Sequence, residues 1–202
     1  MPIVVDDKAL RDFFLAKLQE KCAPVRTEIH VSDLTYCLRK AFWRRFKNRQ
    51  FTEQQLIFFL DGHQRQEGLQ SLVPNFDHEH EVHKFGIVGH IDLQEYHPIE
   101  IKTTRARPNG QKPQHYLRQG AYYCLLTGTD TFSLITQYIN DGCLTFETVK
   151  FHRDELDAYA EQMLRDRDLL QRSYDTQNIN VLPLPVDSWQ CTKCEFQAHC
   201  HV

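Results

Sequence analysis

The sequence predicts an α/β fold in which a central sheet is flanked by helices. Apolar residues recur three to four positions apart up to residue 72, and then at every second position between 78 and 103. Helical spacing returns after residue 113, and two more strand-like segments and a long amphipathic segment follow. This order is typical of a sheet covered by helices, and 202 residues fit one domain spanning 1–202.

Helices are expected before the first strand. Residues 6–21 carry apolar side chains at helical spacing. Ser32 is expected to cap a second helix that runs to about Lys47 and contains Cys37. The same spacing predicts a third helix over 52–72.

Strands and helices alternate in the rest of the chain. The predicted segments are strands at 78–85, 87–93 and 99–103, a helix at 114–127, a hairpin of strands 131–140 and 144–151, and a helix at 153–174. The tail from Asn178 onward is rich in proline, and we expect it to be irregular up to its cysteine cluster.

The charge pattern bears on nucleic-acid binding. The formal net charge of −3 argues against a protein that coats DNA passively through an overall basic surface. One stretch is nevertheless basic and interleaved with aromatic residues: Arg39, Lys40, Arg44, Arg45, Lys47 and Arg49. It suits phosphates and stacked bases, so we expect Arg39, Arg44 and Arg45 to bind substrate. The alternative is a helix with a solvated basic face and a buried aromatic face.

The chain has the features of a cytoplasmic protein without membrane contact. No apolar run approaches the ~20 residues that cross a bilayer, and the start lacks the pattern of a secretory signal. The seven cysteines are odd in number and unevenly placed, which argues against a disulfide framework. Metal binding explains them better.

Two carboxylates and a lysine indicate a hard-cation site. Glu100 and Lys102 lie two apart on an expected strand, so their side chains share a face. Antiparallel pairing would bring Asp92, on the preceding strand, beside Glu100. Adjacent carboxylates need a cation between them, and oxygen ligands favour Mg²⁺ or Mn²⁺. Lys102 would stabilise charge on a phosphate, and His63 would shift the preference toward Mn²⁺.

Each of these motifs is weak by itself. A Glu-x-Lys pair occurs on many surface strands, and a lone histidine such as His63 is more often a satisfied side chain than a ligand. Tyr116, Gln119 and Tyr123 share one face of the expected helix at 114–127, where a polar stripe over a core face is the simpler explanation. The strength of the motifs lies in their order along the chain.

A second candidate site consists of cysteines. Cys191 and Cys194 are spaced to reach one metal or cluster, Cys200 follows shortly after them, and Cys37 comes from the other end of the chain. Four thiolates suit zinc or an iron–sulfur cluster. The spacing does not decide between these two.

The motifs together resemble a nuclease family. In chain order they are His63, Gly89-His90-Ile91-Asp92, Glu100-Ile101-Lys102 and Tyr116-x-x-Gln119-x-x-x-Tyr123. This order resembles the RecB-like branch of the PD-(D/E)xK nuclease superfamily over residues 62–123. The resemblance implies a mixed central sheet, with a nuclease core over 56–150.

The resemblance also implies a role for each motif residue. The implied ligands of Mn²⁺ or Mg²⁺ are His63, Asp92, Glu100 and the carbonyl of Ile101. Lys102 would be the catalytic lysine beside Glu100 and Asp92. Gln119 and Tyr123, with Tyr116, would line the site and hold the substrate.

The cysteine layout resembles one group within that superfamily. Ser32, Tyr36, Cys37 and Arg39, together with the three late cysteines, resemble the CRISPR-associated RecB-like exonucleases, the fourth Cas family. Such proteins carry a [4Fe–4S] cluster in most cases and a [2Fe–2S] cluster in some. Segments 28–50 and 178–202 would then hold a structural cluster through Cys37, Cys191, Cys194 and Cys200.

The resemblance implies a metal-dependent 5′→3′ exonuclease acting on single-stranded DNA. It would process prespacer ends in CRISPR adaptation with the Cas integrase complex as partner, while an endonuclease side activity and a homo-oligomeric state are left open. One alternative is a non-catalytic, metal-stabilised module that binds DNA or docks the integrase. The paired carboxylates argue against it, because a pure binder does not need them facing phosphates. Another alternative is a RecB-like repair nuclease outside CRISPR.

Overall fold

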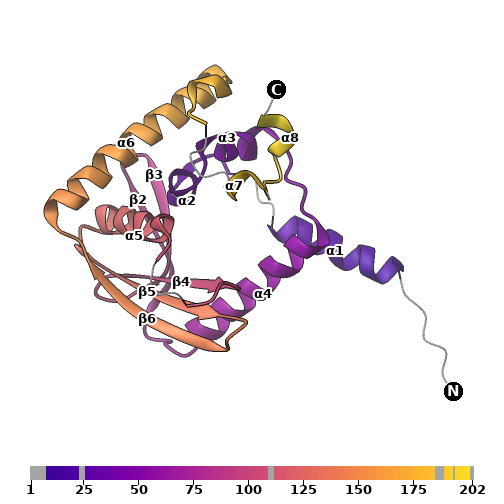
Figure 1. The fold of residues 1–202 in the computed structure, drawn as a ribbon, viewed down its shortest axis with the longest axis horizontal. Helices are drawn as coiled ribbons and strands as arrows, with labels where there is room; N and C mark the ends of the chain where they lie inside the picture. Colours follow the sequence, from indigo (N-terminus) through magenta and orange to yellow (C-terminus); the bar gives the residue numbers. More distant parts are fainter. Residues whose placement is uncertain (1–7, 23–25, 109–111, 185–188, 193, 201–202) are drawn as a thin grey trace.

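The structure is a computed structural model that describes residues 8–22, 26–108, 112–184, 189–192 and 194–200 (Figure 1). Its strands are β1 Ile29–His30, β2 Asp77–Lys84, β3 Ile87–Gln94, β4 Pro98–Thr104, β5 Thr131–Tyr138 and β6 Cys143–Lys150. Its helices are α1 Lys8–Cys22, α2 Val31–Thr35, α3 Leu38–Phe46, α4 Glu53–Gln70, α5 Gln114–Thr127, α6 Arg153–Thr176, α7 Trp189–Thr192 and α8 Gln197–Cys200, with a 3₁₀ turn, η1, at Ile179–Val181.

The strands form one mixed sheet of six strands in the order β1-β3-β4-β5-β6, and β2 pairs with the other edge of β3. β1 and β5 run parallel to their neighbours β3 and β4, whereas the remaining pairs are antiparallel. The expected α/β class with a mixed sheet is therefore confirmed.

β3 and β4 pair only near the turn that joins them. Their register contains the pairs Leu93–Ile99 and Gln94–Pro98 and no others among the described residues. β1 pairs with the far end of the same β3 edge, at Ile87 and Val88. The edge of β3 between these two contacts, residues 89–92, is therefore left without a strand neighbour.

Helices cover the sheet and close the core. α5 packs on β3, β4 and β5, and α6 packs against α5 (Figure 1). Tyr122 on α5 and Phe132 on β5 are fully buried between these layers. A Cβ atom at Gly120 would overlap the Phe132 ring, so only glycine allows α5 to approach the sheet this closely.

Local sequence explains where several helices begin and end. Thr52 starts α4 because its hydroxyl accepts a hydrogen bond from the Gln55 backbone N–H at 3.3 Å, while the Gln55 side chain accepts one from the Thr52 N–H at 2.9 Å. Gly128 ends α5 in the left-handed conformation, with φ of 78°. The helices expected at 6–21, 52–72, 114–127 and 153–174 and all expected strands occur within about two residues of their predicted bounds.

The helix expected from Ser32 to Lys47 is wrong in two respects. The chain forms two helices, α2 and α3, and Ser32 lies inside α2 rather than capping it. His30 is the N-cap residue of α2, and its backbone N–H donates to the Asp33 carboxylate at 3.0 Å. Cys37 lies in extended backbone at the start of α3, so its side chain is not part of a continuous helical face.

The tail is more regular than predicted. After η1, the described part of the tail contains the two short helices α7 and α8, which carry two of the late cysteines. Both lie beside α3 in Figure 1, so the tail is next to a segment from the first quarter of the chain. None of the helices in the described part of the chain combines the length and apolarity needed to span a bilayer.

Candidate active site between β3 and β4

The split between β3 and β4 positions the two predicted carboxylates. In β3, the pairing with β4 begins at Leu93, directly after Asp92. In β4, Glu100 directly follows Ile99, the partner of Leu93. The Asp92 Oδ2 atom accepts a hydrogen bond of 2.6 Å from the backbone N–H of Ile101. The Asp92 carboxylate thus replaces a backbone carbonyl as the acceptor for the Ile101 N–H. This bond holds Asp92 beside Glu100, as predicted.

Glu100 is buried and only half satisfied. Its Oε1 atom accepts hydrogen bonds from the Lys102 ammonium group and from Gln119 Nε2, the latter at 2.8 Å. Its Oε2 atom is buried and has no hydrogen-bond partner among the described residues. An unpaired carboxylate oxygen in a buried position is costly, and a cation would relieve that cost.

The two buried carboxylates share a single ammonium group, that of Lys102. Burial, and then the charge of Glu100, raise the pKa of Asp92 well above its ordinary value, although Lys102 and the Ile101 hydrogen bond oppose the change. Burial lowers the pKa of Lys102, but the charges of Glu100, Tyr36 and Asp92 and the hydrogen bond to Glu100 together outweigh burial, so the net pKa is raised. Lys102 is therefore an ammonium group at neutral pH.

The predicted residues on α5 support the carboxylates. Gln119 Nε2 bonds to both Glu100 and the Tyr123 hydroxyl, at 2.8 and 2.9 Å. The Tyr123 hydroxyl donates to the His90 carbonyl at 2.6 Å, on the edge of β3 that has no strand neighbour. Burial raises the pKa of Tyr123 well above its ordinary value, so the hydroxyl stays protonated. Tyr116 lies beside the lysine, with Lys102 Nζ 5.6 Å from its ring centroid.

α4 contributes residues that the sequence did not single out. Gln66 Nε2 donates to Asp92 Oδ1 at 2.9 Å and to Glu79 Oε1 at 2.7 Å. Gln70 Nε2 donates to the Asp92 carbonyl and to Glu79 Oε1, both at 2.8 Å. Gln66 and Gln70 follow His63 by three and seven positions in the sequence. This helical spacing was the signal that could have placed them on the same face of α4 as His63.

Glu79 is a third carboxylate at this site. It faces Asp92 in the β2–β3 register, between the pairs His78–Leu93 and His80–Ile91. Its φ of 50° lies in the left-handed region, which is rare for a residue other than glycine and is typical of strained functional positions. No sequence pattern marks this residue, because only strand pairing brings it beside Asp92.

The structure does not place His63 with the carboxylates. Its Nε2 atom lies 3.0 Å from Glu67 Oε1 on the same helix. Among the described residues, no group of three or more His, Cys, Asp or Glu side chains converges closely enough to hold a metal ion. The buried pair of carboxylates with an orphaned oxygen nevertheless fits a hard cation, with the Ile101 carbonyl as a further oxygen donor of the same chemistry.

The four predicted cysteines lie together. Cys37, Cys191, Cys194 and Cys200 line one pocket between α3 and the tail. Burial raises the pKa of Cys200, and the neighbouring Cys194 and Cys37 thiols act in the same direction. Four sulfur donors around one pocket are the donor set of a soft metal or an iron–sulfur cluster, although these described thiols do not converge closely enough in this structure to hold a metal ion.

The other cysteines lie elsewhere. Cys124 is buried in the core on α5, and burial raises its pKa to about 11. Cys22 and Cys143 are partly exposed and do not line the pocket of the four cysteines. The layout therefore separates one group of four from three single residues.

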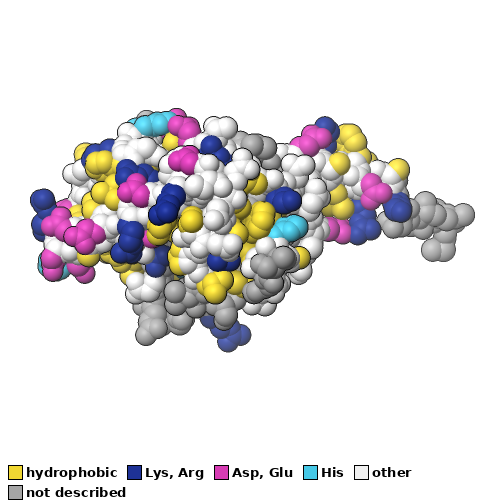
Figure 2. All heavy atoms as spheres, turned by 90° about the horizontal axis from the view of Figure 1, so that it is seen from above, with side chains coloured by type: hydrophobic (Ala, Val, Ile, Leu, Met, Phe, Trp, Pro, Cys, Tyr) yellow, Lys and Arg dark blue, Asp and Glu magenta, His cyan; other side chains and the backbone are white. Residues whose placement is uncertain are grey.

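The basic stretch on α3 is held by contacts within the chain. The Arg39 guanidinium donates to the Leu182 carbonyl at 3.2 and 3.3 Å, and Lys40 forms an ion pair with Glu195 at 2.8 Å. Arg44 lies 3.6 Å from the Asp33 carboxylate, and Arg45 stacks on the Tyr174 ring at 4.4 Å. Basic and acidic side chains are interspersed on the face drawn in Figure 2, so binding of a polyanion would rely on local clusters.

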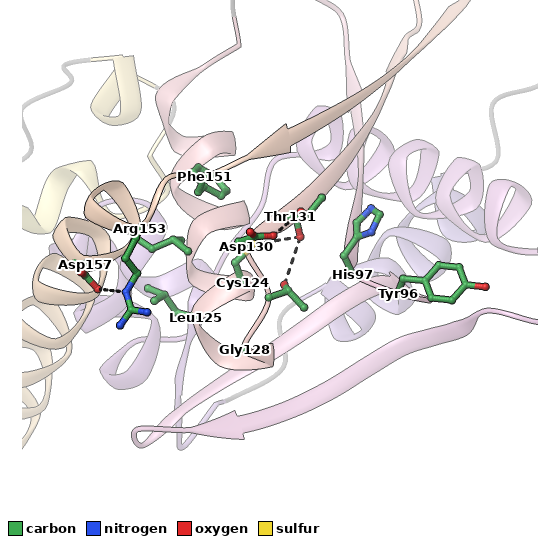
Figure 3. Close-up of a pocket in the computed structure, with 12 residues that line it drawn as sticks. Tyr96, His97, Cys124, Leu125, Gly128, Asp130, Thr131, Phe151, Arg153 and Asp157 are labelled. Carbon is green, nitrogen blue, oxygen red and sulfur yellow. Dashed lines mark hydrogen bonds and ion pairs between the residues drawn. The ribbon is translucent and has the colours of Figure 1, made fainter.

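A large hollow lies at the C-terminal end of α5, and it is separate from the carboxylate site. Figure 3 shows its lining, which includes Tyr96, Asp130 and Arg153. Asp130 and Arg153 bond to their neighbours Thr131 and Asp157, at 2.7 and 3.2 Å. No catalytic residue predicted from the sequence lines this hollow.

No protein-family model matches the sequence, and a search of curated proteins finds no match. Solved structures do match. The crystal structure of SSO0001 aligns with a TM-score of 0.65 at 21% identity, covering 95% of this chain and 96% of the other. LHK-Exo in complex with dAMP aligns with a TM-score of 0.51 at 10% identity, covering 84% and 97%. LHK-Exo is an alkaline exonuclease from Laribacter hongkongensis. The chain therefore shares its fold with an exonuclease.

Proposed function

We propose that this protein is a metal-dependent nuclease that hydrolyses phosphodiester bonds at DNA ends. The observation that carries the proposal is the buried pair Asp92 and Glu100, held with a charged Lys102 in the gap between β3 and β4. The likeness to an exonuclease fold supports it. A binding module without catalysis would not need two carboxylates buried side by side at a desolvation cost.

The residues have distinct roles in the proposed reaction. Asp92, Glu100 and the Ile101 carbonyl would hold Mg²⁺ or Mn²⁺, and His63 would join them by turning away from Glu67. The bound cation supplies Lewis acidity toward the phosphate. Lys102 donates hydrogen bonds to the oxygens on which negative charge grows, which is the electrostatic stabilisation that lowers the barrier most.

The surrounding residues keep this arrangement in place. Gln119 fixes the Glu100 carboxylate through the bond to Oε1, and Tyr123 holds β3 through the His90 carbonyl. Gln66 and Gln70 fasten α4, the helix that carries His63, to Asp92. Any contact of Gln119, Tyr123 or Tyr116 with DNA would add to this supporting role.

We further propose that Cys37, Cys191, Cys194 and Cys200 hold a [4Fe–4S] cluster, with [2Fe–2S] as the alternative and zinc as the competing metal. The four thiols, one just before α3 and three in the tail, line the same pocket, which supports this. The role would be structural, because the cluster would fasten the tail to α3 in the way that a structural metal stabilises a small fold.

The finer activity follows from the motif resemblance. We propose a 5′→3′ exonuclease on single-stranded DNA that trims prespacer ends in CRISPR adaptation, in the cytoplasm and with the Cas integrase complex as partner. A test uses single-stranded oligonucleotides labelled at either end, with Mg²⁺, Mn²⁺ or EDTA. We expect cation-dependent shortening from the 5′ end, whereas intact substrate under every cation condition would overturn the nuclease proposal.

A further inference from the structure

Four arginines from separate places in the sequence converge on one pocket beside α3. They are Arg26, which precedes β1, Arg44 and Arg45, near the end of α3, and Arg49, which follows that helix. The acidic residues that line the same pocket are Glu28 and Asp33. A third carboxylate, Glu195, forms an ion pair with Arg49 from outside the lining, so four guanidinium groups against three carboxylates leave an excess of one positive charge.

The arginines are close enough to repel one another. Burial, followed by the charge of Arg44, lowers the pKa of Arg49 to about 10, and Arg26 acts in the same direction although Glu195 opposes it. The Nε atom of Arg44 is buried and lacks a hydrogen-bond partner among the described residues, whereas the buried Nε atom of Arg49 lies 3.4 Å from Glu195 Oε1 in an ion pair. Repelling charges and an unsatisfied donor in one pocket are the features that an anion would relieve.

Contacts within the chain hold all four of these side chains in position. Arg44 Nη1 lies 3.6 Å from the Asp33 carboxylate, and Arg49 Nη1 donates to the Cys22 carbonyl at 3.2 Å. The Arg45 guanidinium donates to the Thr27 carbonyl at 2.6 Å and stacks on the Tyr174 ring. Arg26 Nη1 donates to the Ser32 hydroxyl at 3.1 Å. Each guanidinium group has five N–H donors, and these contacts use only some of them, so N–H donors remain for a ligand.

The pocket is connected to the candidate active site through α2. Asp33 on α2 lines the pocket, and His30, the N-cap residue of the same short helix, stacks on His90 with 5.2 Å between ring centroids. His90 precedes Asp92 by two residues on β3, so the two side chains lie on the same face of the strand. A strand of nucleic acid lying along this face could reach both places.

We propose that this arginine pocket binds one phosphate group of the DNA strand on which the active site acts. The guanidinium fork matches phosphate oxygens in pairs, which is why arginine clusters recognise phosphate. The proposal takes its substrate from the proposed function, but binding at the pocket does not require cleavage. Arg26 and Arg49 join Arg44 and Arg45 in this role, whereas Arg39 faces the tail and has no part in it.

The test measures equilibrium binding of single-stranded oligonucleotides in EDTA, where no cleavage occurs, as a function of salt. Arg26→Gln removes the charge of an exposed arginine whose hydrogen bond in the structure goes to Ser32. Arg44→Lys keeps the positive charge but removes the planar guanidinium group. Arg153→Gln, on an exposed arginine of α6, is the matched control. We expect Arg26→Gln to bind about tenfold more weakly. It should also reduce the salt slope by about 0.7. The control should bind like the wild type.

Two oligonucleotides, with a 5′-phosphate and with a 5′-hydroxyl, show which phosphate is bound. A loss confined to the phosphorylated strand identifies a terminal phosphate, and an equal loss on both identifies an internal one; either outcome supports the pocket. Unchanged affinity and salt slope in both Arg26→Gln and Arg44→Lys, with unchanged melting temperatures, would overturn it. Arginine-dependent binding without cleavage under any cation would retain the pocket and reject the nuclease proposal alone.

Discussion

The Asp92 carboxylate accepts a hydrogen bond from the backbone N–H of Ile101 across the split between β3 and β4, at 2.6 Å. This bond places one carboxylate against the strand that carries the other, Glu100, whose Oε2 atom has no hydrogen-bond partner among the described residues. The proposed cation chemistry depends on this relationship, because two strands in full register would pair their backbones and close the space between the two side chains.

Loss of either carboxylate should abolish cation-dependent cleavage. Asp92→Ala and Glu100→Ala each remove an oxygen ligand, and the cleavage rate should fall by more than about 10²-fold. The measurement is single-turnover cleavage with Mn²⁺ or Mg²⁺, with circular dichroism to show that the fold is retained. Glu161→Gln, on the exposed side of α6, is the control and should cleave normally. Full activity in either alanine variant would contradict the assignment.

Neutralising Asp92 should stabilise the protein in the absence of cations. The pKa of Asp92 is raised in the folded state, so the protonated form favours folding and this contribution is lost as pH rises through the raised pKa. Asp92→Asn removes the ionised form while keeping an oxygen for the Ile101 N–H. In EDTA at neutral pH, the variant should therefore melt several degrees higher than the wild type, and the difference should shrink toward pH 4.

Adding Mn²⁺ should reverse that order. The cation binds the folded wild type and raises its melting temperature by mass action, whereas the variant lacks a charged ligand. A wild type that melts at the same temperature with and without Mn²⁺ would contradict a cation site at Asp92.

Lys102→Ala should separate cation binding from catalysis. An ammonium group cannot be a ligand, so the variant should keep the Mn²⁺-dependent rise in melting temperature while its cleavage rate falls by about 10²-fold or more. Lys150→Ala, on an exposed lysine of β6, is the matched control. Normal single-turnover cleavage by cation-saturated Lys102→Ala would exclude a catalytic role.

Each of the four clustered cysteines should be needed for one shared metal centre. Alanine at Cys37, Cys191, Cys194 or Cys200 should lower the iron content, remove visible absorbance and lower the melting temperature, because the tail is then released from α3. Cys22→Ala and Cys143→Ala should keep iron and colour. The measurement is the iron content and visible absorbance of protein purified without oxygen. Full iron retention in Cys37→Ala would mean that the metal is bound by the tail cysteines without Cys37.

Much of the architecture could be predicted from local pattern. The change of apolar spacing from three or four to two marks the strands, and it placed β2, β3 and β4 within a residue or two of their observed bounds. The order of the motifs also indicated Asp92, Glu100 and Lys102, because side chains two apart on a strand must share a face. Both properties follow from the geometry of the backbone over a few residues.

Tertiary packing governed the rest. Helical spacing could not indicate the break at Cys37 between α2 and α3, because apolar residues continue through it and the break is set by how the segment packs on the tail and the sheet. Glu79 has no sequence signature, since only β2 pairing brings it to Asp92. The basic stretch indicated Arg44, Arg45 and Arg49, but only folding brings Arg26 to them. The His63 side chain turns toward Glu67 and not toward the carboxylates. The spacing of residues in the sequence could not predict this orientation, because it depends on which groups surround the side chain in the folded protein.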